Sequence, residues 1–185
     1  MNIKRVLLAA TVMVGFTGTA FAAMSGTVMV GGAAMYPTKN IVQNAVNSKD
    51  NTTLVAAVKA AGLVPALEGK GPFTVFAPTN EAFNLLPAGT VPTLLKPANK
   101  AELKSILLYH VVSGDYTFRA LTALIRGHDG KATLKTLNGA PLTFTMNGPH
   151  NIVVTDAKGG SANIIIYNVK QSNGVIQVIN RVLMP

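Results

Sequence analysis

The chain has 185 residues, of which 49% are apolar and only 12% are charged, and its formal net charge is +9. This apolar content excludes a chain that is disordered throughout, and the length suits one domain with a single sizeable core. The sequence contains no cysteine, which excludes disulfide bonds, thiolate zinc sites, iron–sulfur clusters and cysteine nucleophiles.

The first 22 residues have the pattern of a secretory signal peptide. Lys4 and Arg5 precede an apolar run over residues 6–16, and Ala20-Phe21-Ala22 forms the small-residue site at which such peptides are cleaved. The apolar run is shorter than the roughly 20 residues that a membrane-spanning helix needs. We therefore expect an exported, soluble protein, periplasmic or extracellular, that starts at Ala23 and has no transmembrane segment.

The lysines of the remaining chain are scattered singly, without a basic run or an arginine-rich arm. Nucleic acid is therefore not an expected partner. Two alternatives stay open for this positive charge: a dispersed solvated surface, or a weak, salt-sensitive attraction to anionic membranes or acidic glycans.

Helical signals dominate the chain up to residue 62. Residues 23–37 are glycine-rich and lack a clear period, so we expect a flexible N-terminal lead-in there. Apolar residues then follow helical spacing over residues 41–46 and 54–61, and Gly62 supplies a C-terminal cap for the second helix.

The first predicted strand covers residues 73–76, where apolar and polar residues alternate up to Pro78. Thr79 or Asn80 can cap the short helix that follows. Asn99 stands three residues before Glu102, which resembles a capping box at the start of a further helix. The shared face of that helix consists of Leu103, Ile106, Leu107 and His110.

Strand and turn signals dominate the second half. Residues 111–112 favour extended structure, and Thr117 caps a helix that reaches Arg126. Strands are then expected over residues 133–136, 142–146, 152–155, 163–169 and 175–182. Asn138-Gly139 predicts a hairpin turn in which both residues have positive φ, and Asn173-Gly174 predicts another turn. This order of helices and strands favours an α+β fold over a doubly wound sheet.

The sequence offers no catalytic signature. No serine lies in a G-x-S-x-G frame, and no phosphate-binding loop is present. The three histidines, at positions 110, 128 and 150, lie eighteen or more residues apart, so a metal site is not expected. No catalytic residue and no cofactor is predicted. His110 has two open interpretations: a packed core histidine, or a recognition residue at a helix end.

Three segments resemble the fasciclin (FAS1) domain family. Residues 71–83 resemble its first signature segment, Tyr109-His110-Val111-Val112 matches its central tyrosine–histidine motif, and residues 173–185 resemble its second signature segment. The resemblance covers about residues 38–185. Gln177 and Asn180 stand where many members carry His and Asp.

The resemblance implies an α+β fold, in which a β-wedge has helices packed around it. It implies that the signature segments are core strands, that the motif histidine ties the first segment to its helix, and that the protein is exported and not an enzyme. Tyr109, His110, Thr79 and Asn80 are the candidate binding or structural residues, and Thr79 or Asn80 is the expected hydrogen-bond partner of His110.

The leading functional hypothesis is a binding or adhesion module whose partner is a protein or glycan of the cell envelope or extracellular matrix. The alternative is a periplasmic protein that binds a small molecule or glycan in a pocket near Tyr109 and His110. The sequence does not distinguish between these two.

Overall fold

A mixed sheet of seven strands runs through the molecule in the computed structural model, which describes residues 26–185. The predicted signal peptide over residues 1–22 lies outside the described residues. The order of the strands is β4-β3-β9-β8-β7-β6-β5. Their bounds are β3 (Phe73–Pro78), β4 (Val111–Ser113), β5 (Lys131–Lys135), β6 (Pro141–Met146), β7 (Ile152–Thr155), β8 (Ser161–Gln171) and β9 (Gly174–Ile179).

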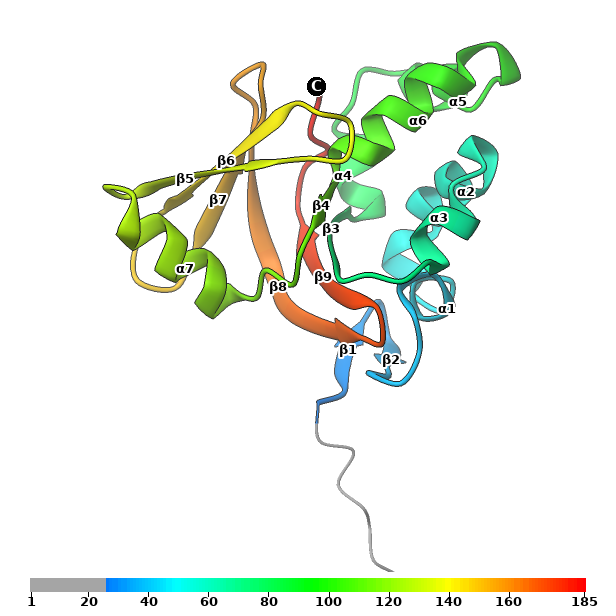
Figure 1. Cartoon of the computed structure of the whole chain (residues 1–185). Coiled ribbons are helices and arrows are strands. Elements are labelled where there is room, and N and C mark those ends of the chain that lie inside the picture. Colours follow the sequence, from blue (N-terminus) through cyan, green and yellow to red (C-terminus); the bar gives the residue numbers. More distant parts are fainter. Residues whose placement is uncertain (1–25) are drawn as a thin grey trace, which may run out of the picture.

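Helices cover both sides of this sheet. They are α1 (Ile41–Ala45), α2 (Thr52–Ala61), α3 (Val64–Glu68), α4 (Asn80–Asn84), α5 (Thr90–Leu94), α6 (Lys100–Tyr109) and α7 (Phe118–Gly127). Figure 1 shows α1 to α6 gathered on one side, β5 to β7 with α7 on the other, and β3, β8 and β9 between them. The predicted α+β fold is confirmed.

The two signature segments pair directly. Strand β3 lies parallel to β9 over six residue pairs, from Phe73 opposite Gly174 to Pro78 opposite Ile179. β9 is therefore flanked on both sides, by β3 and by the antiparallel strand β8. The resemblance implies that the signature segments are core strands, and the structure confirms this. Phe73 is half-buried, and these residues are buried: Val75, Val175, Ile176, Val178 and Ile179.

Strand β8 bends the sheet into a nearly closed wedge. Its pairing with β9 is shifted on both sides of Ile166, so the strand can turn away from β9 and continue along β7. An isolated bridge between Val112 of β4 and Thr136, the residue directly after β5, brings the two edge strands of the sheet together. The bend therefore creates an interior that the sheet largely encloses.

Two large apolar cores result, beside a smaller cluster around Ala82, Ile106 and Val182. One lies between the helices α1, α2, α3 and α6 and the strands β3 and β9. The other fills the interior of the wedge and includes Phe76, Phe144 and, from α7, Leu121 and Ile125. The rings of Phe76 and Phe144 lie 5.3 Å apart at their centroids. Residues of β3 thus enter both cores, since alternate side chains of a strand point to opposite faces.

The prediction of a flexible lead-in over residues 23–37 is wrong for the described part. The hairpin β1 (Val28–Val30) and β2 (Ala33–Met35) forms there, and Val30 and Met35 are buried in the first core. Gly31 and Gly32 both have positive φ, 58° and 74°. The glycines that suggested mobility are the residues that a tight turn requires.

The helices predicted over residues 41–46 and 54–61 are confirmed, as are the cap at Gly62, the short helix after Thr79 and the helix capped by Thr117. The capping box at Asn99 is wrong: its side chain donates to the carbonyl of Thr93 at 2.7 Å and makes no cap bond. The predicted strand over 175–182 ends earlier, at Ile179, and the helices α3 and α5 were not predicted.

The hairpin at Asn138-Gly139 is confirmed, but its turn geometry differs from the prediction. Only Gly139 has positive φ, at 97°. The Gly139 N–H donates to Thr136 at 3.0 Å, and the Asn138 side chain accepts from the N–H of Ala140 at 2.9 Å. Asn138 thus stabilises the turn through its side chain.

Candidate functional site

The tyrosine–histidine motif lies where α6 ends and β4 begins, and both of its side chains are buried. Tyr109 is 0% exposed and His110 is 2% exposed. They point into different parts of the molecule: Tyr109 belongs to the core inside the wedge, whereas His110 lies against the core under the helices. His110 lines an apolar cavity in that core, and Tyr109 is not among the residues that line it.

Both ring nitrogens of His110 have backbone partners. Nδ1 lies 2.9 Å from the carbonyl oxygen of Ile106, and Nε2 lies 3.0 Å from the N–H of Leu183. Because Leu183 can only donate, Nε2 must accept and Nδ1 carries the proton. The Ile106 carbonyl needs this partner because the backbone N–H of His110 bonds to Leu107 instead.

This arrangement requires a neutral imidazole. Burial lowers the pKa of His110 from 6.5 to about 4, and the hydrogen bond to Ile106 and the nearby Asp156 carboxylate oppose this shift only in part. A proton on Nε2 would also remove the acceptor of the Leu183 N–H. His110 therefore joins the helix to the last residues of the chain, which leave the sheet after β9.

Asp156 holds the next residue of the same segment. Its Oδ2 accepts from the N–H of Met184 at 3.1 Å, and its Oδ1 accepts from the N–H groups of Lys158 and Gly160 at 2.9 and 2.7 Å. His110 and Asp156 thus bind two consecutive N–H groups, those of Leu183 and Met184. These side chains fix the path of the C-terminal segment.

Tyr109 makes a similar structural bridge. Its hydroxyl donates to the carbonyl of Pro141 at 2.8 Å and accepts from the N–H of Ala157 at 2.8 Å. Burial raises the pKa of this phenol. The hydroxyl therefore stays protonated and joins β6 to the loop after β7.

The expectation that Thr79 or Asn80 bonds His110 is wrong. The Thr79 hydroxyl accepts from the N–H of Ala82 as the cap of α4. The Asn80 side chain donates to the carbonyl of Lys49 at 2.8 Å and accepts from the N–H of Thr53 at 3.0 Å. Thr79 thus caps α4, Asn80 joins α4 to the start of α2, and the four candidate residues do not form one site.

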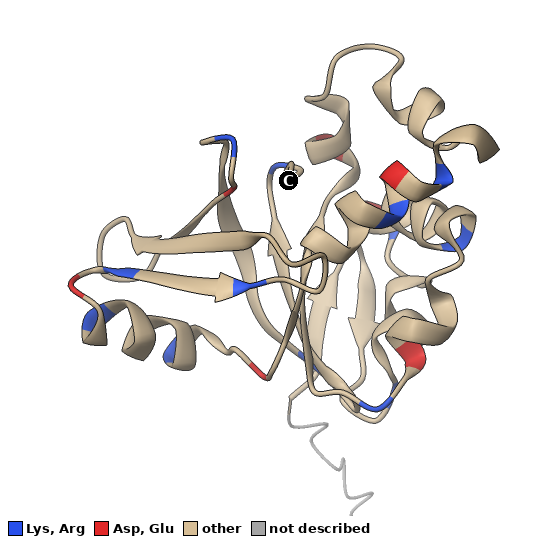
Figure 2. Cartoon of the chain, turned by 45° about the horizontal axis from the view of Figure 1, so that its top comes forward, with Lys and Arg blue, Asp and Glu red and all other residues tan. Residues whose placement is uncertain are grey.

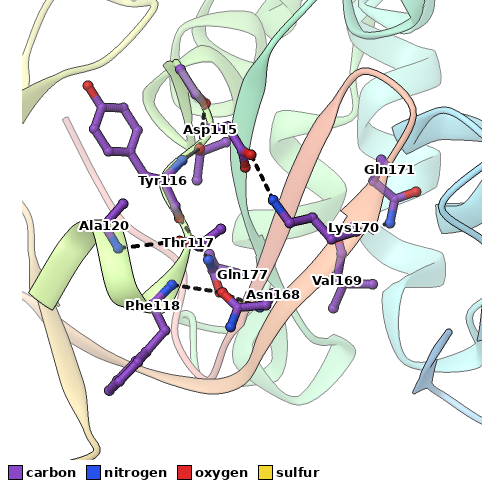
Figure 3. A network of polar contacts seen from close by, with 12 residues as sticks. Asp115, Tyr116, Thr117, Phe118, Ala120, Asn168, Val169, Lys170, Gln171 and Gln177 are labelled. Carbon is purple, nitrogen blue, oxygen red and sulfur yellow. Dashed lines mark hydrogen bonds and ion pairs between the residues drawn. The ribbon is translucent and has the colours of Figure 1, made fainter. Parts of the chain in front are cut away.

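Gln177, in the second signature segment, organises the loop before α7. It is 0% exposed, its amide donates to the carbonyl of Tyr116 at 2.8 Å, and its oxygen accepts from the N–H of Asn168 at 2.9 Å. The Asn168 side chain in turn accepts from the N–H of Phe118 at 2.7 Å. Figure 3 shows this network between β8, β9 and the start of α7.

An open polar groove of about 600 Å³ lies beside this network, and sequence reasoning missed it. Its walls come from the start of α1, the segment from α3 to β3, the loop after β4, and the turn between β8 and β9. These segments lie far apart in the sequence, and the two signature segments contribute only their first residues, 71–72 and 173–174. The groove is lined by Asn40, Gln43, Glu68, Gly69, Lys70, Gly71, Pro72, Asp115, Lys170, Gln171, Ser172, Asn173 and Gly174.

Asn173 holds one end of this groove in place. Its oxygen accepts from the N–H of Ile41 at 3.1 Å, and its amide donates to the carbonyls of Leu67 and Gly69 at 2.8 and 3.0 Å. These three bonds use both N–H donors of the amide and one of the two lone pairs of its oxygen. The turn between β8 and β9 is therefore tied to α1 and α3.

Both acidic and basic side chains line the rest of the groove. Lys170 and Asp115 form an ion pair of 2.7 Å with both side chains partly exposed, and Glu68 and Lys70 are exposed on the opposite wall. Figure 2 shows that acidic and basic positions are spread over the whole molecule in the same way. Within residues 26–185, no three His, Asp or Glu side chains come together as metal ligands.

The sequence profile of the Fasciclin domain matches residues 49–185. The chain belongs to the fasciclin domain family. Protein sll1483 of Synechocystis sp. is 44% identical over 157 residues, which is 85% of this chain and 79% of that protein. The cell surface glycolipoprotein MPB83 of Mycobacterium bovis is 34% identical over 166 residues, 87% of this chain and 66% of that protein.

The fold of this fasciclin domain also matches a solved structure. The FAS1 domain pair of the insect cell adhesion molecule fasciclin I superimposes with a TM-score of 0.71 at 19% identity, over 80% of this chain and 51% of the insect chain. At this identity the match supports the fold alone. Across residues 26–185, no helix has both the length and the apolar content to cross a lipid bilayer.

Proposed function

We propose that this fasciclin domain is an exported, non-catalytic binding module that acts in adhesion at the cell envelope or in the extracellular matrix. The proposal rests on family membership, since the relatives include a cell surface glycolipoprotein. The predicted signal peptide agrees with export, although it lies outside the described residues.

The polar groove is the surface that we assign to this binding. The tyrosine–histidine motif is occupied by internal hydrogen bonds, so a partner needs another surface. The groove is open and offers the exposed side chains of Gln43, Glu68 and Lys70. Amide and charged groups of both signs suit the polar rim of a protein interface or the hydroxyl groups of a glycan.

A binding assay with a matched control tests this proposal. The purified protein is added to immobilised envelope and matrix fractions, beside a double variant in the groove, Glu68→Ala with Lys70→Ala. Its control is Glu102→Ala with Lys104→Ala on α6, which removes the same two charges from exposed positions outside the groove. We expect retention to fall at least threefold in the groove variant and to stay unchanged in the control. Equal retention of all three proteins contradicts the assignment.

The second candidate function is the binding of a small glycan in the same groove. The volume of about 600 Å³ favours it, since it lies within the range of ligand pockets, roughly 300–1,000 Å³. A screen of envelope sugars by thermal unfolding separates the two functions. A bound sugar raises the melting temperature by mass action, whereas an adhesion module with a protein partner shows no such increase with any free sugar.

A further inference from the structure

A second cavity, of apolar character, lies inside the helical half of the domain. It has a volume of about 50 Å³ and lies between the helices α1, α2 and α3 and the strands β3 and β9. Val75 and Ile176 form its floor on the sheet, and Leu54, Val58 and Leu67 line it from the helices. This space is several times the roughly 10–15 Å³ that one water molecule needs.

The buried polar side chains that line this cavity already make hydrogen bonds within the protein. Ser48 donates to Asn51 at 2.9 Å, and Asn51 donates to the carbonyl of Pro78 at 3.0 Å. Both nitrogens of His110 are bonded to backbone groups. The rest of the lining is aliphatic, and a cavity with an apolar wall takes up apolar molecules.

The cavity reaches the surface between the three helices. Val42 and Ala45 of α1, Val55 of α2 and Val64 of α3 all line it and are partly exposed. Lys59 of α2 also lines it and is exposed. An entry for a narrow apolar group therefore exists at this surface, and a positive charge stands beside it.

The ammonium group of Lys59 favours a ligand with a negative charge at this entry. Its ammonium group makes no ion pair within residues 26–185. Lysine keeps its charged end in water while its methylene groups lie along apolar surface. A ligand with an apolar chain in the cavity would thus place a terminal anion next to Lys59.

We propose that this cavity binds the end of an aliphatic chain and that Lys59 binds the carboxylate of the same molecule. The ligand class is a medium-chain alkyl carboxylate. Its apolar chain matches the largely aliphatic wall, and its negative charge matches the ammonium group of Lys59 at the entry. This site is separate from the polar groove and does not depend on it.

Titration of the purified protein with decanoate, and in parallel with decanol, tests the proposal. Three measurements are made: the melting temperature, the dissociation constant, and the methyl NMR shifts of the wild-type protein. We expect decanoate to raise the melting temperature and to shift the methyl groups of Val58, Val75 and Ile176. Shifts that are absent, or that spread over surface methyl groups elsewhere, overturn the proposal without any variant.

Two variants and their matched controls locate the two parts of the ligand. Ala45→Leu fills the cavity and should weaken decanoate binding at least tenfold, whereas Ala60→Leu on the exposed face of α2 should not. Lys59→Gln should weaken decanoate binding about threefold or more and leave decanol unaffected, whereas Lys104→Gln should change neither. Unchanged binding by Ala45→Leu overturns the cavity site, and equal binding of decanoate by Lys59→Gln and the wild type overturns the carboxylate assignment.

Discussion

Replacing His110 by alanine removes an imidazole that supplies both a donor and an acceptor inside the protein. The carbonyl of Ile106 and the N–H of Leu183 then lose their partners. Each buried polar group left unsatisfied costs about 1–3 kcal/mol, and the space left by the ring adds a cavity cost. We expect the free energy of unfolding to fall by about 3–5 kcal/mol, a large part of the 5–15 kcal/mol typical of a domain.

The same imidazole predicts how stability changes with pH. In the folded protein the pKa is about 4, and in the unfolded chain it is 6.5. Between these values the unfolded chain binds a proton that the folded protein does not bind, so acid favours unfolding. The contribution of His110 is therefore complete above pH 6.5 and is lost as the pH falls towards 4, on the order of 3 kcal/mol in total.

Urea unfolding followed by circular dichroism, at pH 7 and at pH 5, measures both effects. His110→Asn can keep the bond to Ile106 but is too short to reach Leu183, so its loss at pH 7 should be smaller than that of His110→Ala. Both variants should lose the part of the pH dependence that comes from the imidazole. Comparison with the wild type at each pH removes the contribution of carboxylates that titrate in the same range.

His128 provides a matched control. Its Nδ1 also contacts the carbonyl four residues earlier, that of Leu124, at 2.9 Å, but the side chain is exposed. His128→Ala should therefore cost less than about 1 kcal/mol. If His110→Ala is as stable as His128→Ala, or if the wild type shows the same pH dependence as His110→Ala, the structural role assigned to this histidine is wrong.

Three further predictions concern the β8–β9 turn and its surroundings. Gly174→Ala should destabilise the domain by more than about 2 kcal/mol. Gly174 has a φ of +154°, and a Cβ there would lie 2.8 Å from backbone atoms of Phe73. An unchanged melting temperature would contradict this. Asn173→Ala should cost about 2–3 kcal/mol in a urea titration, because three backbone groups lose their partner; a loss below about 0.5 kcal/mol would count against it. Lys170→Met should lower the free energy of unfolding by less than about 1 kcal/mol at low salt, since the ion pair with Asp115 is partly exposed. A larger loss of stability would contradict this.

The sequence predicted the parts of the fold that depend on local chemistry. The caps at Gly62, Thr79 and Thr117 follow from backbone preferences, and the structure confirms them. The alternation predicted over residues 73–76 does not appear as alternate burial, because β3 and β9 are buried on both faces. Local sequence patterns gave a wrong prediction where one residue type suits two structures, as glycine suits both a mobile segment and a tight turn. The glycines at 31 and 32 form a turn between short strands instead of a mobile segment.

The candidate site was less predictable for a physical reason. Helical spacing placed His110 on the buried face of α6, and the structure confirms its burial. Its partners could not be derived from spacing, because Leu183 lies 73 residues away and contributes a backbone N–H that any amino acid except proline would supply. The polar groove escaped detection for the same reason, since its walls meet only through tertiary packing.

The position of β9 between β3 and β8 has a consequence for how the domain forms. About one hundred residues separate β3 from its parallel neighbour, so neither apolar core can close until almost the whole domain has emerged. Folding dominated by such distant contacts is slow compared with that of helical proteins. For a chain that is exported as proposed, slow closure would keep it extended long enough to pass through an export channel. The same delay would leave its strand edges open to self-association if that export were blocked.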